Sequence, residues 1–314
     1  METAKGRRFV ARGLAPRAAV ALGRLAGRLS RAWGQRGLGT LFAASRRVPG
    51  FSGATCRVVH RSGATFELEV FEPYWGPVLV AGRAYEPEVL HTLRRFASLD
   101  PVLVDCGANV GFWSVIASAP EIGLSRVVAI EPNPTTYRRL LRNAELNGGR
   151  YHCVKRAVSH TSGETVQLVD AARHAVARIG EDPGGTPVET ITVDAVLADR
   201  GWVSPDDRIL LKLDVEGHEL AALEGARATT RRDHAIIFEE LTQHGFCTFE
   251  ALLARGYAIY DINARGTARA LADRAGAQSA ATAAGRLGRA RNFVASSPGG
   301  KFARVLEGWA REAV

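Results

Sequence analysis

Apolar residues follow two different periods along this chain, and the two alternate from about residue 100 onward. Short apolar runs of strand length are separated by segments in which apolar residues recur every three or four positions, as at Tyr137, Leu140 and Ala144. Strands that alternate with helices pair in parallel, and the helices cover both faces of the sheet. Seven runs have the length and composition of strands: 102–104, 126–130, 151–154, 209–213, 235–238, 257–262 and 292–295.

The pattern predicts three regions. Residues 100–314 are expected to form an α/β domain, a Rossmann-like doubly wound and mostly parallel seven-stranded sheet with helices on both faces. Residues 51–99 precede it as a small β-hairpin and a helix, and residues 1–50 form a basic, Arg-rich N-terminal extension. Within the domain, the Ala/Arg/Gly-rich residues 264–290 are expected to be a low-complexity connection, which we interpret as a lid.

The overall composition is that of a globular protein. Of 314 residues, 46% are hydrophobic and 23% are charged, which excludes disordered and collagen-like classes. No apolar run approaches the roughly 18 residues that a membrane-spanning helix requires. The four cysteines form no C-x-x-C pair and no zinc-ligand cluster, so we expect a reducing, cytoplasmic setting.

The positive charge belongs to the N-terminal extension alone. Residues 1–50 have a net charge of +10, whereas the remaining residues carry −1, so the domain offers no basic face for nucleic acid. Within the extension, leucines recur at helical spacing beside arginines, which would suit an amphipathic helix in weak peripheral contact with anionic lipid at the inner membrane face. A solvated, partly disordered extension is the interpretation we favour, because Ala and Gly offer little apolar area to bury.

A glycine-bearing turn follows the first strand of the domain. Gly107 and Gly111 lack a side chain that would keep a ligand away from the backbone, and the amides of the next helix point outward there. A dinucleotide fingerprint would need further glycines where this chain has Asn109 and Phe112, so a nicotinamide-dependent oxidoreductase is disfavoured. Tight packing of strand against helix explains the glycines equally well.

Acidic residues follow the next strands of the predicted sheet. Glu131 ends the second strand, 26 residues beyond Asp105, where a carboxylate can accept hydrogen bonds from two ribose hydroxyls; a merely solvated acid is the alternative. Asp214, Glu216 and His218 follow the strand at 209–213. Parallel strands present their carboxyl ends at one edge, so these groups are expected to share a site.

Two further acids, Glu239 and Glu240, end the next strand. Neighbouring residues on a strand point to opposite faces, so only one of them should face that edge.

With these residues, the chain resembles the FkbM-type family of S-adenosylmethionine-dependent methyltransferases, a branch of the class I methyltransferase fold, over about residues 82–262. The resemblance rests on five short motifs: Tyr85-Glu86-Pro87-Glu88, Asp105-x-Gly107-Ala108-Asn109-x-Gly111, Ile130-Glu131-Pro132-Asn133, Thr192-Val193-Asp194 and Lys212-x-Asp214-Val215-Glu216-Gly217-His218-Glu219. It implies S-adenosyl-L-methionine as cofactor. The residues it assigns to the cofactor are Gly107, Asn109 and Gly111 around the methionine part, Glu131 on the ribose, Ala157 near the adenine and Asp214 beside the transferred methyl, together with Asp105 of the same motif.

The family implies methyl transfer, commonly to a hydroxyl, on a sugar, glycolipid or polyketide-type metabolite. An alcohol needs a base or a metal to lose its proton, and we expect the base among Asp214, Glu216 and His218, with His244 in reserve. A Mg²⁺ ion held by Asp214 with Glu239 or Glu240 is an alternative that we rank below the metal-free scheme. A non-catalytic protein that binds S-adenosylmethionine is the other alternative.

Overall fold

The computed structural model describes residues 7–60, 62–169, 178–180, 184–240, 246–283 and 291–312. The chain divides into two compact units. The first comprises Met1–Tyr85 with the short segments Ala119–Glu121 and Glu145–Gly149, and the second contains the rest. The boundaries expected from the sequence lay at residues 50 and 99, whereas compactness places the division at Tyr85.

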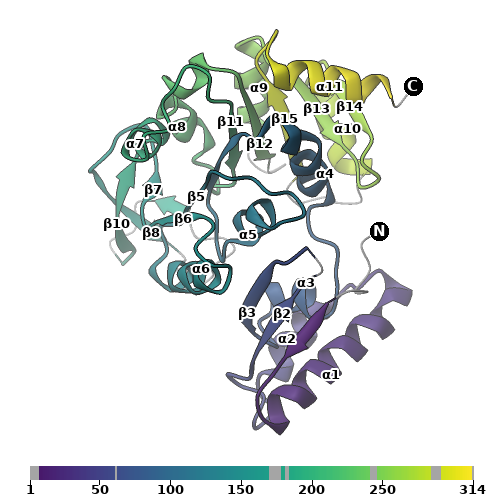
Figure 1. Ribbon diagram of the computed structural model, residues 1–314. Helices are drawn as coiled ribbons and strands as arrows, with labels where there is room; N and C mark the ends of the chain where they lie inside the picture. The colour runs from purple at the N-terminus through teal and green to yellow at the C-terminus, as the bar shows by residue number, and fades with distance from the viewer. Residues whose placement is uncertain are drawn as a thin grey trace. The chain divides into compact units, whose positions relative to one another are not determined.

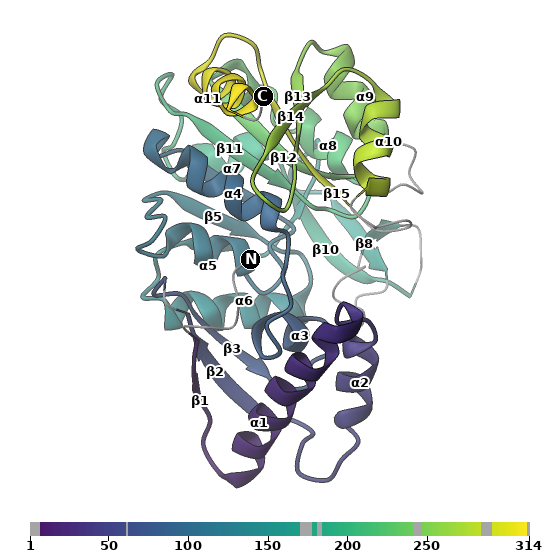
Figure 2. The same cartoon turned by 90° about the vertical axis from the view of Figure 1, so that its right-hand side faces the viewer.

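Among its described residues, the first unit combines a three-stranded antiparallel sheet with three α-helices and one short 3₁₀ helix; Figures 1 and 2 show the helices α1, α2 and α3 beside the sheet. The expected hairpin forms as β2 and β3, and β1, from the N-terminal extension, pairs with β2. The elements are β1 (Arg8–Val10), α1 (Leu14–Leu29), the short η1 (Ser30–Trp33), α2 (Leu38–Ser45), β2 (Thr55–Val59), β3 (Thr65–Glu69) and α3 (Trp75–Leu79).

The N-terminal extension is therefore folded over residues 7–50, and the favoured interpretation of a disordered segment was wrong there. Small residues explain the error. The buried face of α1 is formed by Ala19, Val20, Gly23 and Gly27, and a Cβ added at Gly27 would overlap the backbone of Ala81. Small side chains supply little area themselves, but they allow a helix to pack closely against its neighbours.

The second unit is built on an eight-stranded sheet of order β14-β13-β15-β12-β11-β4-β5-β6. The strands from β12 to β6 are mutually parallel, whereas β15, β13 and β14 pair antiparallel. All seven expected strands are present. The bounds are β4 (Val102–Cys106), β5 (Val127–Ile130), β6 (His152–Val154), β11 (Ile209–Leu213), β12 (His234–Glu240), β13 (Ala258–Ile262), β14 (Ala268–Leu271) and β15 (Arg291–Ser296).

The eighth strand corrects two expectations, the count of seven strands and the structureless connection at 264–290. Within that stretch the structure has β14 and the helix α10 (Arg274–Ala283), while 284–290 lies outside the described residues. β14 reads Ala-Arg-Ala-Leu and pairs with β13 at the edge of the sheet. Its two middle residues are exposed, which explains why no apolar run marks it in the sequence.

Helices cover both faces of this sheet (Figures 1 and 2). Side chains of α7, α8, α9 and α10 join one apolar core with the strands. On the opposite face, α4 packs against α11 through Phe96 and Phe302, whose ring centroids are 4.7 Å apart. The bounds are α4 (Pro87–Phe96), η2 (Ala97–Leu99), α5 (Phe112–Ser118), α6 (Pro134–Leu146), α7 (Val193–Asp199), α8 (Glu219–Glu224), η3 (Thr229–Arg231), α9 (Cys247–Ala254) and α11 (Lys301–Arg311).

A second, four-stranded sheet of order β7-β10-β8-β9 is inserted between β6 and β11. Its strands are β7 (Ala157–Val158), β8 (Thr165–Val169), β9 (Arg178–Gly180) and β10 (Thr186–Ile191). The four cysteines, all within the described residues, form no disulfide. Among the described helices, none combines the length and the apolar character needed to cross a membrane.

Candidate active site

The turn after β4 is shaped by packing inside the protein. Gly107 has φ +78°, and a Cβ there would overlap the carbonyl oxygen of Asp214. At Gly111, with φ +81°, a Cβ would lie 2.6 Å from Leu140 Cδ1 and 2.9 Å from the Tyr151 hydroxyl. Both glycines are thus explained by the close approach of neighbouring elements. A contact between their backbone and a cofactor stays a prediction.

Glu131, at the end of β5, is hydrogen-bonded to this turn. Its Oε2 accepts a hydrogen bond from the Asn109 amide and its Oε1 from the Asn133 amide, both at 2.9 Å. The side chain is buried, and burial raises the pKa of the carboxyl to about 7 although the two amides favour the charged form. Asp214 and Asp105 are close enough to raise that pKa further. The structure therefore brings Asn109, Glu131 and Asp214 together at one sheet edge.

Asp105 faces the interior. Its Oδ2 accepts a hydrogen bond of 2.7 Å from the Ser114 hydroxyl on α5, and the residue is only 1% exposed. Burial raises the pKa of the carboxyl, while the nearby Lys212 lowers it. Asp105 on β4 thus interacts with Ser114 on α5 and with Lys212 on β11. Its inward orientation adds no support to the predicted contact with the cofactor, which stays a prediction.

Lys212 was not assigned a role from the sequence. It is the next-to-last residue of β11, is 2% exposed, and its Nζ is 2.8 Å from Asp214 Oδ2. Burial opposes its charge, but Asp214, Glu86 and Asp105 together raise its pKa. A single charged residue within an otherwise apolar strand was the available signal, because such a strand is buried on both faces and its charge needs a partner.

Glu86 was quoted in a motif without a role, and it is also part of this network. Its Oε2 accepts a hydrogen bond of 2.7 Å from Trp113 Nε1. Burial raises the pKa of Glu86 to about 7, Lys212 lowers it, and Asp214 raises it. The residue has φ +37°, a conformation rare for a side chain of this size, directly before the proline that begins α4. The rare backbone conformation of Glu86 and its burial fit a residue that is held in place by its contacts with Trp113 and the charged network around Lys212.

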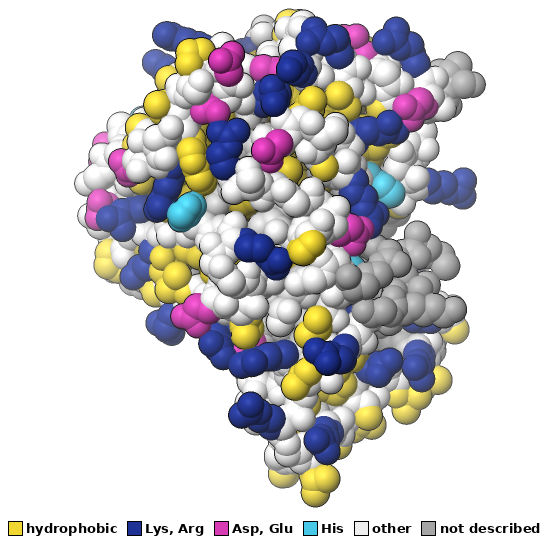
Figure 3. Space-filling view, in the orientation of Figure 1, with side chains coloured by type: hydrophobic (Ala, Val, Ile, Leu, Met, Phe, Trp, Pro, Cys, Tyr) yellow, Lys and Arg dark blue, Asp and Glu magenta, His cyan; other side chains and the backbone are white. Residues whose placement is uncertain are grey.

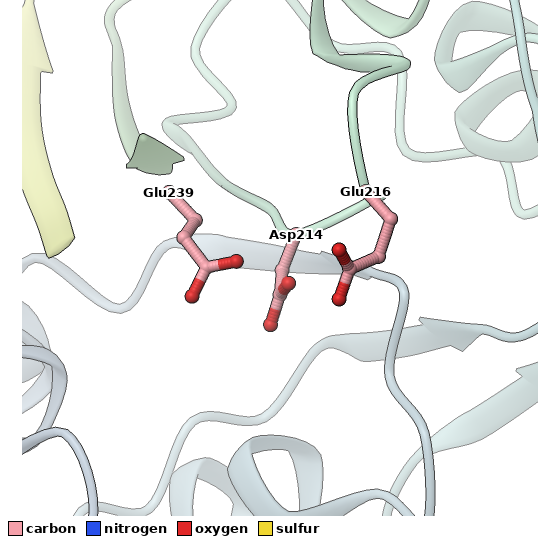
Figure 4. A group of neighbouring side chains, drawn as sticks. All are labelled: Asp214, Glu216 and Glu239. Atoms are coloured by element: carbon pink, nitrogen blue, oxygen red, sulfur yellow. The ribbon is translucent and has the colours of Figure 1, made fainter. Parts of the chain in front are cut away.

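Three carboxylates meet where β11 and β12 end. Asp214, Glu216 and Glu239 each bring an oxygen within 4.8 Å of the others. Figure 4 shows Asp214 between the two glutamates, with all three carboxylates on the same side of the strand ends. Burial, followed by Asp214 and Glu86, raises the pKa of Glu239 well above its usual range.

Glu240 turns to the other face of β12, as the alternation along a strand predicts. Its Oε1 accepts a hydrogen bond of 2.6 Å from the Phe249 amide, on α9. Of Glu239 and Glu240, only Glu239 therefore belongs to the group with Asp214 and Glu216.

Within the described part of the chain, two predicted residues, His218 and Ala157, are not part of this carboxylate group. His218 Nε2 lies 3.1 Å from the Ser159 hydroxyl, and burial, followed by His160, lowers the pKa of this imidazole. Ala157 is buried and packs with Leu168 and Val188 inside the small sheet. His244 lies outside the described residues.

Comparison with known proteins identifies the domain. Residues 105–259 match the family described as the methyltransferase FkbM domain. The chain carries an FkbM methyltransferase domain. The matched segment begins at Asp105 and ends within β13, so it contains the β4 turn, Glu131 and all three clustered carboxylates.

A curated relative acts on a sugar acid. The hexuronic acid methyltransferase AglP of Haloferax volcanii is 28% identical over 177 residues, which are 56% of this chain and 70% of that protein.

Solved structures of methyltransferases are also similar. The FkbM methyltransferase of Methylobacillus flagellatus is 18% identical with a TM-score of 0.38, over 73% of this chain and 54% of that one. This chain thus spans about half of that protein. Precorrin-6y C5,15-methyltransferase of Geobacter metallireducens is 17% identical with a TM-score of 0.35, over 66% and 85% of the two chains. TYW2 of P. horikoshii, solved with MeSAdo, is 16% identical with a TM-score of 0.36, over 77% and 70%.

Proposed function

We propose that this protein transfers a methyl group from S-adenosyl-L-methionine to a hydroxyl oxygen of a sugar, in a glycan or a lipid-linked glycan. The observation that carries the proposal is the group of three carboxylates, Asp214, Glu216 and Glu239, beside the turn held by Glu131. The FkbM domain supports methyl transfer. A sugar acceptor is supported by the similarity to a hexuronic acid methyltransferase.

The charge of this sheet edge fits a cationic cofactor. Asp214, Glu216 and Glu239 gather there, Asp214 also acts on the buried carboxyl of Glu131, and the buried Lys212 pairs with Asp214. The cofactor supplies a methyl group already activated by a positive sulfonium, and acidic groups favour that charge. In the proposed arrangement the backbone from Gly107 to Gly111 holds the methionine part. Each Glu131 oxygen accepts a hydrogen bond from one backbone amide and can accept a second one, from a ribose hydroxyl.

Proton removal from the acceptor hydroxyl is assigned to the carboxylates. We choose Glu239 as the base, because its raised pKa makes it a stronger base than an ordinary carboxylate near neutral pH. Asp214 Oδ2 is held by Lys212, which suits a role in orienting the acceptor beside the methyl group. Glu216 lies on the other side of Asp214 (Figure 4) and completes the acceptor site. His218 is held at Ser159 and becomes the weaker choice of base.

Magnesium stays the second choice. Three carboxylates offer the oxygen ligands that Mg²⁺ prefers. We retain the metal-free scheme because Lys212 already supplies a cation to Asp214, and because the raised pKa of Glu239 suits a proton acceptor. In the methyl-transfer assay described next, we expect a metal chelator to leave the rate of methyl transfer unchanged. A rate that the chelator abolishes and that Mg²⁺ restores would favour the magnesium scheme over the metal-free one.

The test is an assay with S-adenosyl-L-methionine and glycans that contain hexuronic acid. We expect release of S-adenosylhomocysteine and an O-methylated sugar, located by mass spectrometry. Asp214→Ala should abolish turnover. Binding of S-adenosylhomocysteine without turnover on any sugar would instead favour a non-catalytic binding protein.

The proton acceptor is tested by Glu239→Gln. General base catalysis contributes about 10²- to 10⁴-fold, so we expect kcat to fall by that range while affinity for the cofactor is retained. In the unmodified enzyme, kcat should rise with pH through a pKa well above that of an ordinary carboxyl, because the base must be ionised. Glu240→Gln is the matched control on the opposite face of β12. An active Glu239→Gln variant would move the base elsewhere.

A further inference from the structure

Helix α1 exposes its leucines and buries its small residues. Ten large apolar side chains are exposed among the described residues, and seven of them lie between residues 10 and 48. On α1 itself, Leu22, Leu25 and Leu29 are 47%, 48% and 60% exposed. A folded protein rarely leaves a contiguous apolar patch open unless it meets another molecule.

These leucines belong to one groove in the first unit. A groove of about 480 Å³ runs between α1 and α2, and Leu22, Leu25 and Leu29 line it together with Leu41 of α2. Leu41 is 49% exposed. The exposed apolar side chains of the two helices thus form a single continuous surface, which we call the leucine groove.

In the part of the sequence that contains the leucine groove, all charged residues are basic. No Asp or Glu occurs between Glu2 and Glu67, a stretch that contains most of the arginines of the first unit. Arg28 directly precedes Leu29, Arg31 follows it by two residues, and both arginines are exposed. Arg36 lines the groove itself. Figure 3 shows hydrophobic and basic side chains gathered together on the part of the molecule that contains α1.

The leucines and arginines occupy adjoining arcs of α1. At 3.6 residues per turn, the exposed leucines fall within about 80° of one another, and Arg17, Arg24 and Arg28 follow on one side of them. The helix is 16 residues long, or about 24 Å. An apolar stripe bordered by arginines along such a length is the arrangement of a helix that lies in the plane of a membrane interface.

From this geometry we infer that the first unit docks on a membrane surface that contains anionic phospholipid. The leucine groove enters the apolar layer, and the arginines contact the phosphate layer above it. A second copy of the chain is disfavoured, because two surfaces of the same positive sign would repel each other. A membrane offers apolar chains and negative charges at once, which matches both halves of the surface. The inference does not depend on the proposed methyl acceptor.

The experiment measures binding of the full-length protein to vesicles by flotation. Vesicles of phosphatidylcholine alone are compared with vesicles that also contain phosphatidylglycerol. The double variant Leu25→Asp/Leu29→Asp should bind the anionic vesicles at least about tenfold more weakly, because it removes apolar side chains from the bilayer. Arg28→Gln/Arg31→Gln should weaken binding to anionic vesicles roughly tenfold or more and leave binding to neutral vesicles unchanged.

The matched control is Val203→Asp/Leu141→Asp. These two apolar side chains, 48% and 39% exposed, belong to the second unit and should tolerate the change without any effect on vesicle binding. Circular dichroism verifies that each variant is folded. The inference is overturned if the unmodified protein ignores anionic vesicles, or if the leucine variant binds them as well as the control does. It is also overturned if sedimentation shows a dimer that the leucine variant abolishes while no vesicle binding occurs.

Discussion

Glu86 shows how burial and partners compete at a single carboxyl. Burial raises its pKa from 4.5 to about 7, against the effects of Lys212 and of the Trp113 hydrogen bond. Between these two pH values, the folded chain keeps a proton on Glu86 that the unfolded chain has lost. Stability from this group is therefore fully present below pH 4.5 and is lost as the pH rises through about 7.

Replacement of Glu86 by Gln should flatten this pH dependence. Glutamine retains an oxygen for Trp113 Nε1 and has no proton to lose. We expect the variant to regain, near pH 8, stability on the order of 3 kcal/mol at most, since a shift of one pKa unit corresponds to about 1.4 kcal/mol. Urea unfolding at pH 5 and pH 8 measures the difference.

Part of the pH dependence should remain in that variant, because burial also raises the pKa of Glu131 and Glu240 to about 7. Glu189→Gln, at an exposed position, serves as the control and should leave the profile unchanged. An identical slope in the Glu86→Gln and unmodified proteins would show that Glu86 does not hold its proton in the folded state.

At the scale of elements, the approach of β4 to β11 sets the geometry of the site. The two strands pair in parallel, with Lys212 opposite Asp105, and the Asp214 amide donates a hydrogen bond to the Cys106 carbonyl at 3.2 Å. Gly107 lies directly against the Asp214 backbone. The turn that we assign to the cofactor and the acid that we assign to the acceptor are thus held in one fixed arrangement.

Gly107→Ala should disrupt this arrangement. The new Cβ would overlap the Asp214 carbonyl oxygen and lie 2.8 Å from its carbon, and strand pairing prevents either backbone from moving away. With the cost of a positive φ added, we expect a loss of roughly 2–4 kcal/mol in the free energy of unfolding. Chemical denaturation gives this value, and the remaining folded protein should bind S-adenosylhomocysteine weakly.

Gly163→Ala separates the two causes of that loss. Gly163 also has a positive φ, +85°, but a Cβ there has nothing within 4 Å. It should cost only about 1 kcal/mol, the effect of the backbone conformation alone. Equal losses in the two variants would mean that the contact with Asp214 contributes nothing.

The strands were predictable where apolar runs mark a buried position, and less so elsewhere. β5 is a continuous apolar run, and β4 and β11 are apolar except for Asp105 and Lys212, because parallel central strands are buried on both faces. The edge strand β14 carries no such run. In α1, the leucine period was visible, but the glycine and alanine face that anchors the helix looked like a sequence with nothing to bury.

The site was predictable to the extent that it follows strand ends. Glu131 and Asp214 were expected at one edge because they follow β5 and β11, and parallel strands bring such residues together. Lys212 and Glu86 have partners that depend on strand register and on a segment before the domain, and no local pattern reports such contacts. His218 follows the same strand as Asp214, but its contact with Ser159 of the inserted region could not be read from spacing.

At the scale of the whole molecule, the basic segment and the residues assigned to the cofactor belong to different units. The N-terminal 50 residues carry a net charge of +10, and the rest of the chain carries −1. The leucine groove lies in the first compact unit, whereas the residues assigned to the cofactor and the methyl acceptor lie in the second. Two ligands should therefore act on different parts of the chain.

Hydrogen exchange tests this division directly. S-adenosylhomocysteine should slow amide exchange in the second unit, around Gly107–Gly111 and Asp214–His218, because a bound ligand protects the backbone that it contacts and stabilises the folded state. Anionic vesicles should slow exchange in α1 and leave those two segments unchanged. Vesicles of phosphatidylcholine alone are the control for the second effect, since they lack the charge that the arginines require. Protection of α1 by S-adenosylhomocysteine, or of the Asp214 segment by vesicles, would show that the two surfaces do not act separately, because each ligand would then stabilise a unit that it is not proposed to touch.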